Sequence, residues 1–201
     1  NVIGVSMPSS FSSSHSKSDA KILADNLGIR FETIPINELY ERALSNMESF
    51  FKDTPRGLAE ENLQARIRGN ILMSISNKIG ALVLNTGNKT ELALGYCTMY
   101  GDMCGAIGVI SDINKLEVYE VSKWINKNSD KILIPENSIN KAPSAELSED
   151  QYDPFDYNIV SPIVDYIINE LYDADTLIEL GYDPDLISDI LNKIHRLLKF
   201  F

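Results

Sequence analysis

Strand and helix patterns alternate along the first two thirds of the chain. Residues 2–7 and 81–84 are short, nearly continuous apolar runs, as expected of strands covered on both faces, with 81–84 the clearest buried strand. Residues 31–36 alternate between apolar and polar side chains, which also predicts a strand. Helical spacing of apolar residues occurs at 19–27, 38–51, 57–78 and 114–127. The alternation predicts an α/β fold with a doubly wound parallel sheet.

The last third of the chain has a different pattern. Residues 135–151 read as irregular, and the pattern from Pro154 onward is wholly helical. We therefore expect a helical C-terminal part laid against the sheet. The length of 201 residues fits one domain, so residues 1–201 are predicted to form a single unit. The longest predicted helix carries an apolar stripe at Leu63, Ile67, Ile71 and Ile75.

The charge balance argues against two classes of partner. The formal net charge is −11, whereas nucleic-acid and anionic membrane surfaces require clustered Lys and Arg. No apolar run approaches the roughly 18 residues of a membrane helix, and Asn1–Val5 lacks the basic region of a signal peptide. Only two cysteines occur, Cys97 and Cys104, which argues against a disulfide framework and favours a cytoplasmic protein.

In a parallel α/β sheet, ligands bind beyond the carboxyl ends of the strands. Two turns occupy that position here, Ser6–Ser9 after the first strand and Asn85–Gly87 after the central one. In the second turn, the Thr86 hydroxyl and free backbone N–H groups could meet a phosphate, and Glu91 could hold a cation. The alternative is an ordinary capped turn between a strand and a helix.

Two further polar groups could contribute to a site. Asn62, Arg66 and Asn70 lie at i, i+4 and i+8 of the long helix, where a guanidinium can pair with a phosphate or a carboxylate. The alternative is a solvated helix face with Arg68 as a neighbour. Residues 96–108 combine glycines, two tyrosines and an aspartate, as in a loop around a ligand or a packed loop. Spacing alone predicts a nucleotide-binding α/β domain and specifies no reaction.

Five ordered segments give the chain a resemblance to a known family. The segments are Gly4–Ser9 with Ser12-Ser13, Glu61–Gly69, Thr86–Thr98, Tyr100–Asp102 and Lys141–Leu147. Over nearly its whole length the chain resembles NAD synthetases, especially the synthetase domain of the glutamine-dependent enzymes. The resemblance implies an adenine nucleotide alpha-hydrolase-like fold of the ATP pyrophosphatase type.

The resemblance also implies a carbon–nitrogen ligase reaction. ATP would adenylate the nicotinate carboxylate of deamido-NAD, and ammonia, free or released from glutamine, would displace AMP to form NAD. Mg²⁺ would accompany ATP and offset charge on its phosphates. A homodimer or higher oligomer is implied, with the dinucleotide bound near the subunit interface. Neither a nucleic acid nor a membrane is expected as a partner.

The resemblance assigns roles to ten residues. The ATP-binding residues would be Ser6, Met7, Thr86, Lys115 and Ser144. The deamido-NAD-binding residues would be Asn62, Arg66, Glu91, Tyr100 and Asp102, and Glu91 would also bind the metal. No catalytic residue is assigned.

The chain departs from the family pattern at two places, and one further position indicates the branch of the family. The Ser-Gly-Gly-x-Asp-Ser pyrophosphate loop, which would precede Asn1, does not occur in these residues, so we expect an N-terminally incomplete synthetase domain. Leu-Leu-Lys-Phe-Phe follows Arg196 where the family has a basic segment. Met99 stands where ammonia-dependent relatives often carry Lys, which favours the glutamine-dependent branch. Two alternatives are a non-catalytic nucleotide-binding or dimerisation module and another ATP pyrophosphatase, and the Asn62–Gly69 and Thr86–Tyr96 segments argue against the latter.

Overall fold

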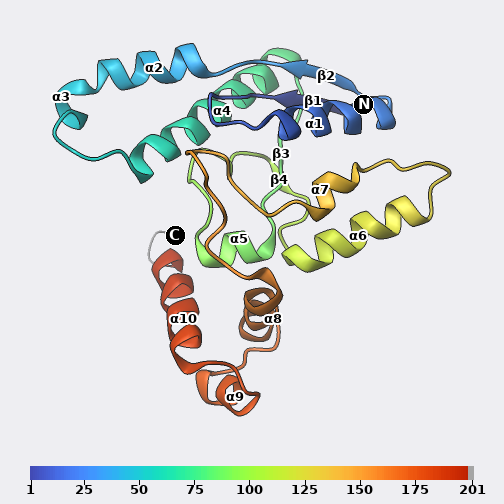
Figure 1. The fold of residues 1–201 in the computed structure, drawn as a ribbon, viewed down its shortest axis with the longest axis vertical. Helices are drawn as coiled ribbons and strands as arrows, with labels where there is room; N and C mark the ends of the chain where they lie inside the picture. The colour runs from blue at the N-terminus through green and yellow to red at the C-terminus, as the bar shows by residue number, and fades with distance from the viewer. Residues whose placement is uncertain (199–201) are drawn as a thin grey trace.

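The computed structural model describes residues 1–198, with strands and helices alternating through most of the chain (Figure 1). The end of the predicted domain, residues 199–201, lies outside the described residues. The strands are β1 (Ile3–Ser6), β2 (Arg30–Thr33), β3 (Leu84–Asn85) and β4 (Ile107–Gly108). The helices are α1 (Ser14–Leu27), α2 (Asn37–Asn46), α3 (Glu48–Phe51), α4 (Leu58–Ile79), α5 (Lys89–Leu94), α6 (Lys115–Lys127), α7 (Glu136–Asn140), α8 (Tyr157–Ile168), α9 (Ala174–Glu179) and α10 (Pro184–Leu198).

The N-terminal layer is built on a parallel pair of strands. β1 pairs with β2 from Ile3↔Arg30 to Ser6↔Thr33, and α1 packs against both strands. Ser13 begins α1 as its N-cap, because its extended backbone lets the hydroxyl accept a hydrogen bond from the Ser16 N–H at 3.0 Å. Gly28 ends the helix at a φ of 64°, as expected of a C-cap glycine.

The second parallel pair is shorter than the sequence predicts. β3 pairs with β4 through Leu84↔Ile107 and Asn85↔Gly108 only. The prediction of a buried strand at 81–84 was wrong, since Leu82 is 69% exposed and Leu84 is 47% exposed. A parallel strand is buried when helices cover both of its faces, and among residues 1–198 no helix packs extensively against β3.

Contacts with a loop determine which face of α4 is buried. The predicted stripe of Leu63, Ile67, Ile71 and Ile75 is only partly buried, whereas Gln64, Ala65 and Gly69 are fully buried. A Cβ atom on Gly69 would lie 2.9 Å from the carbonyl oxygens of both Tyr100 and Gly101, so the loop backbone crosses the helix there. Helical periodicity identified α4 but could not show where this loop crosses it.

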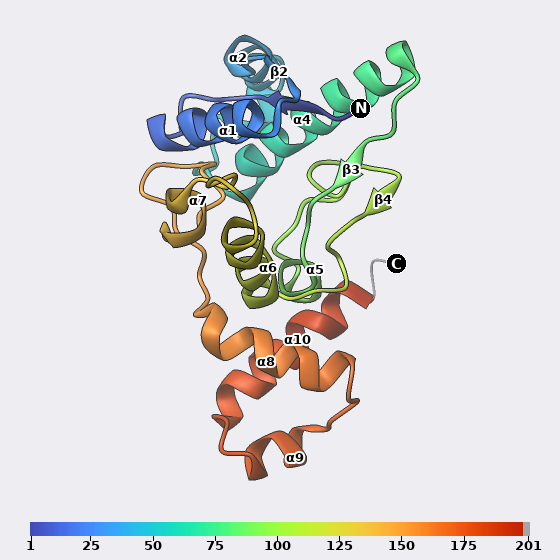
Figure 2. The same cartoon turned by 90° about the vertical axis from the view of Figure 1, so that its right-hand side faces the viewer.

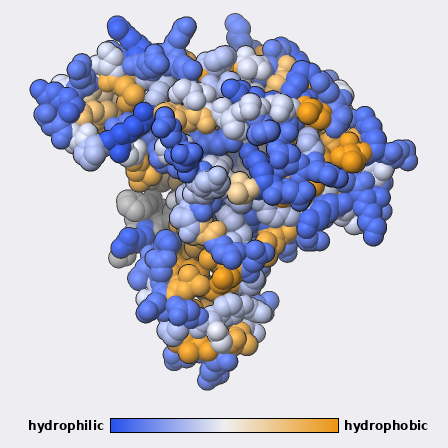
Figure 3. All heavy atoms as spheres, in the orientation of Figure 1, coloured by the Kyte–Doolittle hydropathy of each residue, from blue (hydrophilic) through white to orange (hydrophobic). Residues whose placement is uncertain are grey.

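The main apolar core of the described residues lies among the C-terminal helices. It joins Leu94 of α5 to α8, α9 and α10, with Ile163, Val164 and Leu177 fully buried. These helices extend below α5 and α6, as the rotated view shows (Figure 2). Apolar surface gathers over the same helices (Figure 3), where Leu171 is 81% exposed. The C-terminal part is helical, as expected, but it packs mainly on α5 and α6 and was wrongly expected to lie against a sheet.

The stretch predicted as irregular, 135–151, contains one short helix. α7 begins after Pro135, whose φ of −53° suits the start of a helix, and the Lys141 N–H donates to the Asn137 carbonyl at its end. The turn was missed because five residues are too few to show a 3.6-residue period. No helix in the described part of the chain is long and apolar enough to cross a membrane.

Candidate functional site

A cavity of 390 Å³ lies where α4 and the turn after β3 meet two long loops. Its walls come from α4, from the Asn85–Gly87 turn with α5, from the 96–104 loop, and from the segment between α7 and α8. Six of the ten residues assigned by the resemblance line it: Met7, Thr86, Glu91, Asp102, Lys115 and Ser144. The fold thus brings side chains from five separate segments to one cavity.

The turn after β3 forms an ordinary helix cap and one wall of the cavity at the same time. The Asn88 side chain accepts from the Glu91 N–H at 3.1 Å, and Glu91 Oε2 accepts from the Asn88 N–H at 3.1 Å. This reciprocal pair is a capping box. The other Glu91 oxygen, Oε1, accepts from the Lys115 ammonium at 2.8 Å. The cap therefore orients a charged pair whose side chains are both about one-fifth exposed, at 20% for Glu91 and 19% for Lys115.

Buried polar contacts fix the helix that carries Glu91. Lys89 pairs with Asp165 of α8 at 2.7 Å, and its side chain is only 10% exposed. The Thr90 and Ser161 hydroxyls are 3.1 Å apart, and the Lys115 N–H donates to Thr90 Oγ1 at 3.3 Å. These contacts tie α5 to α6 and α8, so Lys89 and Thr90 support the site from behind rather than lining it.

Two tyrosines and an aspartate lie close to Lys115, and of these Tyr96 and Asp153 line the cavity. The Tyr157 hydroxyl donates to Asp153 Oδ2 at 2.7 Å, and the Lys115 ammonium lies 5.3 Å from the centre of the Tyr157 ring. Burial, and then the Asp153 carboxylate, raise the pKa of both Tyr96 and Tyr157 above their ordinary value. Both phenols therefore stay protonated and serve as hydrogen-bond donors, not as bases.

Four of the assigned residues lie outside the cavity lining. Arg66 is exposed and donates from Nε to the Met99 carbonyl at 3.3 Å, and Tyr100 is 79% exposed with a φ of 61°. The Asn62 side chain accepts from the Thr98 hydroxyl at 2.7 Å. Ser6 ends β1. The binding roles assigned to these four residues stay predictions.

The arginine that faces the cavity is Arg68, which the sequence alone presents only as a neighbour of Arg66. Its Nε donates to the Met7 carbonyl at 2.9 Å, and burial lowers the pKa of the guanidinium while the Glu146 charge opposes that shift. Arg68 lies four residues after Gln64 and three after Ala65, on the buried face of α4. Helical spacing from those two residues could have identified it, had their burial been known.

Metal-binding capacity in the cavity rests on few ligands. No group of three or more His, Cys, Asp or Glu among residues 1–198 is placed to hold a metal ion. Mg²⁺ commonly binds through one or two carboxylates together with substrate phosphates, and Glu91 in the cavity wall fits that mode. Cys97 also lines the cavity, but burial raises the pKa of its thiol to about 11, so the thiol stays protonated near neutral pH.

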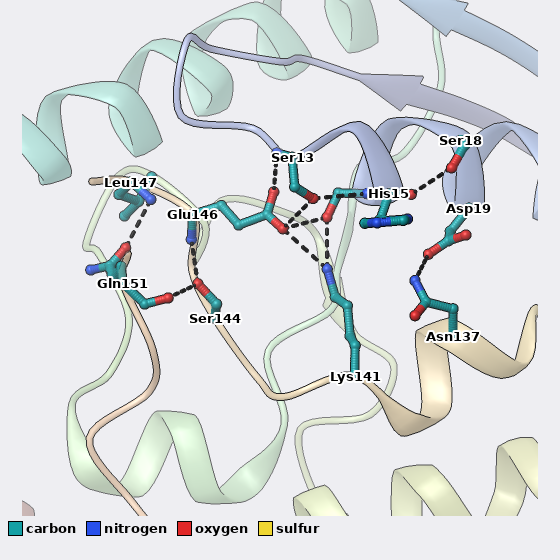
Figure 4. A network of polar contacts seen from close by, with 11 residues as sticks. Ser13, His15, Ser18, Asp19, Asn137, Lys141, Ser144, Glu146, Leu147 and Gln151 are labelled. Carbon is teal, nitrogen blue, oxygen red and sulfur yellow. Dashed lines mark hydrogen bonds and ion pairs between the residues drawn. The ribbon is translucent and has the colours of Figure 1, made fainter. Parts of the chain in front are cut away.

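Behind the Ser144 wall, the Glu146 carboxylate joins segments far apart in sequence (Figure 4). It accepts from the Ser13 N–H at 3.0 Å, the Ser13 hydroxyl at 2.8 Å, the Ser16 hydroxyl at 2.6 Å and the Lys141 ammonium at 3.1 Å. Burial by itself would raise its pKa, but these donors outweigh burial and lower the pKa to about 2.

The low pKa of Glu146 predicts an acid-dependent loss of stability. Its folded-state pKa lies below the ordinary value of 4.5, so its contribution is complete above that pH and is lost between about pH 4.5 and 2. With allowance for solvent screening, the contribution is about 1–2 kcal/mol. We expect urea unfolding at pH 6 and pH 3 to show a larger loss for the unaltered protein than for Glu146→Gln. Equal losses in both proteins would contradict the prediction.

Comparison with known proteins identifies the family of the chain. The NAD synthase family model matches residues 1–197. A glutamine-dependent NAD(+) synthetase from Synechocystis is 43% identical over 202 residues, which cover 98% of this chain and 35% of the relative. A second such synthetase, from Thermotoga maritima, is also 43% identical, with 98% of this chain and 34% of the relative covered. The chain thus spans about a third of the length of these relatives.

Solved structures agree with the predicted fold class. The glutamine-dependent NAD+ synthetase from Acinetobacter baumannii, in complex with ADP, has a TM-score of 0.67 and 34% identity, covering 96% of this chain and 36% of that one. The NH3-dependent NAD synthetase from Campylobacter jejuni has a TM-score of 0.76 and 26% identity, covering 98% of this chain and 73% of that one. Because the family model matches nearly all of the 201 residues, the chain belongs to the NAD synthase family.

Proposed function

We propose that this chain is the amide-forming part of an NAD synthetase. In the proposed reaction, the nicotinate carboxylate of deamido-NAD attacks the α-phosphorus of ATP, which forms an acyl-adenylate and releases pyrophosphate. Ammonia then attacks the activated carbonyl, and NAD, AMP and a proton are released. The observation that carries the proposal is the family match over residues 1–197, together with the six assigned residues around one cavity.

The residues around the cavity are suited to bind ATP for this reaction. Thr86 offers a hydroxyl at the end of β3, and Lys115 offers a cation held in place by Glu91 and the Tyr157 ring. Both groups suit the phosphates of ATP. Mg²⁺, which Glu91 would hold together with those phosphates, supplies further neutralisation of phosphate charge when bound. Arg68 adds a second cation to the cavity wall beside Met7.

The exposed residues outside the cavity support a wider dinucleotide site. Arg66 and Tyr100 lie on the surface, and the Asn62 side chain is held by the Thr98 hydroxyl of the cavity-lining loop. In the family that the chain resembles, the dinucleotide is expected to bind near a subunit interface. We therefore propose that a second copy of the chain completes this outer part of the site. Sedimentation of the protein with and without deamido-NAD tests this proposal.

The direct test is NAD formation from deamido-NAD, ATP, Mg²⁺ and ammonium by the protein. Exchange of labelled pyrophosphate into ATP that depends on deamido-NAD and needs no ammonia reports the adenylation half alone. If the protein catalyses neither pyrophosphate exchange nor amide formation, the ligase proposal is overturned. A stable dimer that binds no dinucleotide would instead favour a structural module.

Replacing Arg66 by alanine is expected to weaken deamido-NAD binding. Loss of one guanidinium–anion contact costs about 1.5–3 kcal/mol, which corresponds to roughly a tenfold to hundredfold rise in Kd. Titration calorimetry with deamido-NAD measures this change. The control is Arg42→Ala, which removes another exposed arginine, on α2, and should leave the Kd unchanged. Equal affinities of the two variants would remove Arg66 from the site.

A further inference from the structure

The strongest unassigned feature is a four-residue polar cluster of Ser13, Ser16, Lys141 and Glu146, which we call the Glu146 latch (Figure 4). In addition to the four hydrogen bonds received by the carboxylate, the Lys141 ammonium donates to the Ser16 hydroxyl at 2.7 Å. Ser13 and Glu146 are 133 residues apart in sequence. The latch therefore connects the start of α1 to the 141–147 segment, which is distant in sequence.

The position of the carboxylate makes this connection strong. Ser13 is the N-cap of α1, so Glu146 lies at the positive end of a 14-residue helix and accepts the Ser13 N–H there. Each hydrogen bond to an ionised group is worth more than one between neutral groups. The N-terminus of α1, the Lys141 ammonium and the Arg68 guanidinium all favour a negative charge at this point.

The backbone of Glu146 indicates that the latch holds the loop in a strained shape. Its φ is 51°, in the left-handed region that non-glycine residues seldom adopt. Such a conformation persists only where surrounding contacts hold it. The Glu146 N–H donates to the Ser144 hydroxyl at 3.1 Å, so the same residue that the latch fixes also orients Ser144.

The latch joins two walls of the cavity. Ser144, Ala145 and Leu147 line one wall, while Met7, held by Arg68, lines the wall that leads into α1. The 141–147 segment is also fastened to α4, because Gln64 Nε2 donates to the Leu147 carbonyl at 2.8 Å. Without the Glu146 contacts, the segment would keep this bond and its local bonds to Gln151 and Asp153, but its connection to α1 would depend on the Lys141–Ser16 bond.

We propose that Glu146 is a positioning residue of the amidation site. Its carboxylate fastens the Ser144 wall to the start of α1 and so sets the affinity for ATP, while the later capture of ammonia does not depend on it. The proposal rests on the proposed function for the identity of the ligand. It predicts an effect on KM for ATP, with kcat nearly unchanged.

The test compares Glu146→Gln with Glu149→Gln, an exposed glutamate of the same loop. Glutamine keeps the shape of Glu146 but removes the charge, so several charge-assisted hydrogen bonds weaken. We expect KM for ATP to rise roughly tenfold or more in Glu146→Gln, with kcat within about a factor of two. Glu149→Gln should behave as the unaltered protein. Glu146→Asp, which restores the charge on a shorter stem, should recover part of the affinity.

Hydrogen exchange in the ligand-free protein separates positioning from general stability. Glu146→Gln should speed exchange at residues 9–16 and 141–151 and leave exchange in α8 and α10 unchanged. An unaltered KM, or faster exchange throughout the protein, would overturn the proposal. ATP binding measured by calorimetry needs no turnover, so binding without amide formation would reject the ligase function and still decide the role of Glu146. Failure of the unaltered protein to bind ATP would reject both.

Discussion

Replacing Glu91 by glutamine is expected to lower kcat for NAD formation by roughly a hundredfold to a thousandfold, the usual cost of losing a group that stabilises developing charge. The glutamine side chain can still accept the Asn88 N–H, so the capping box and the start of α5 are retained. It cannot pair with Lys115 or contribute a charge to a metal bound with ATP. The measurement is steady-state kinetics with saturating ATP and deamido-NAD.

The matched control is Glu117→Gln. Glu117 is the corresponding capping-box residue of α6, where its Oε2 accepts from the Asn114 N–H at 2.7 Å. It does not line the cavity. Both variants should lose little stability, and only Glu91→Gln should lose activity. Equal activity of the two variants would show that Glu91 acts as a helix cap alone.

Replacing Gly69 by alanine is expected to destabilise the protein and to distort the cavity. An added Cβ would lie 2.9 Å from two backbone carbonyl oxygens and 3.0 Å from Cys104 Sγ. Backbone atoms cannot rotate away as a side chain can, so α4 and the 96–104 loop would have to separate. Such overpacking costs about 1–3 kcal/mol, which lowers Tm by several degrees, roughly 3–10 °C, in a chain of this size.

The control for this variant is Gly57→Ala, at the start of the same helix. No atom lies within 4 Å of a Cβ built there, and the φ of −171° is open to any residue. Thermal unfolding should show a large fall in Tm for Gly69→Ala and a small change for Gly57→Ala. A Gly69→Ala protein as stable as the unaltered one would show that the loop does not pack on the helix at backbone distance.

Local patterns in the sequence predicted most of the elements. The predicted helix at 19–27 corresponds to α1, but the helix begins at Ser14, five residues before the predicted start. The predicted helix at 38–51 is divided at Met47 into α2 and α3. These errors lie at element ends, where capping and periodicity compete and the local signal is weakest.

The candidate site was predictable in part. Thr86 directly follows β3 and Glu91 lies in the helix after that turn, so the rule that ligands bind beyond strand ends identified them. Arg68 was not identified, because its position on α4 depends on which face the 96–104 loop covers. Glu146 was not singled out either, since its partners Ser13 and Ser16 are more than 100 residues away in sequence.

The sequence by itself determined the α/β alternation, the turn at Thr86–Glu91 and the resemblance that the family match confirms. All three depend on residues that are close together in the chain, where spacing and residue type carry the information. Only the tertiary structure decided that Arg68 rather than Arg66 faces the cavity, and that Glu146 joins α1 to the Ser144 wall. Those contacts join distant segments, and their energies depend on burial and on hydrogen-bond geometry that a linear pattern does not contain.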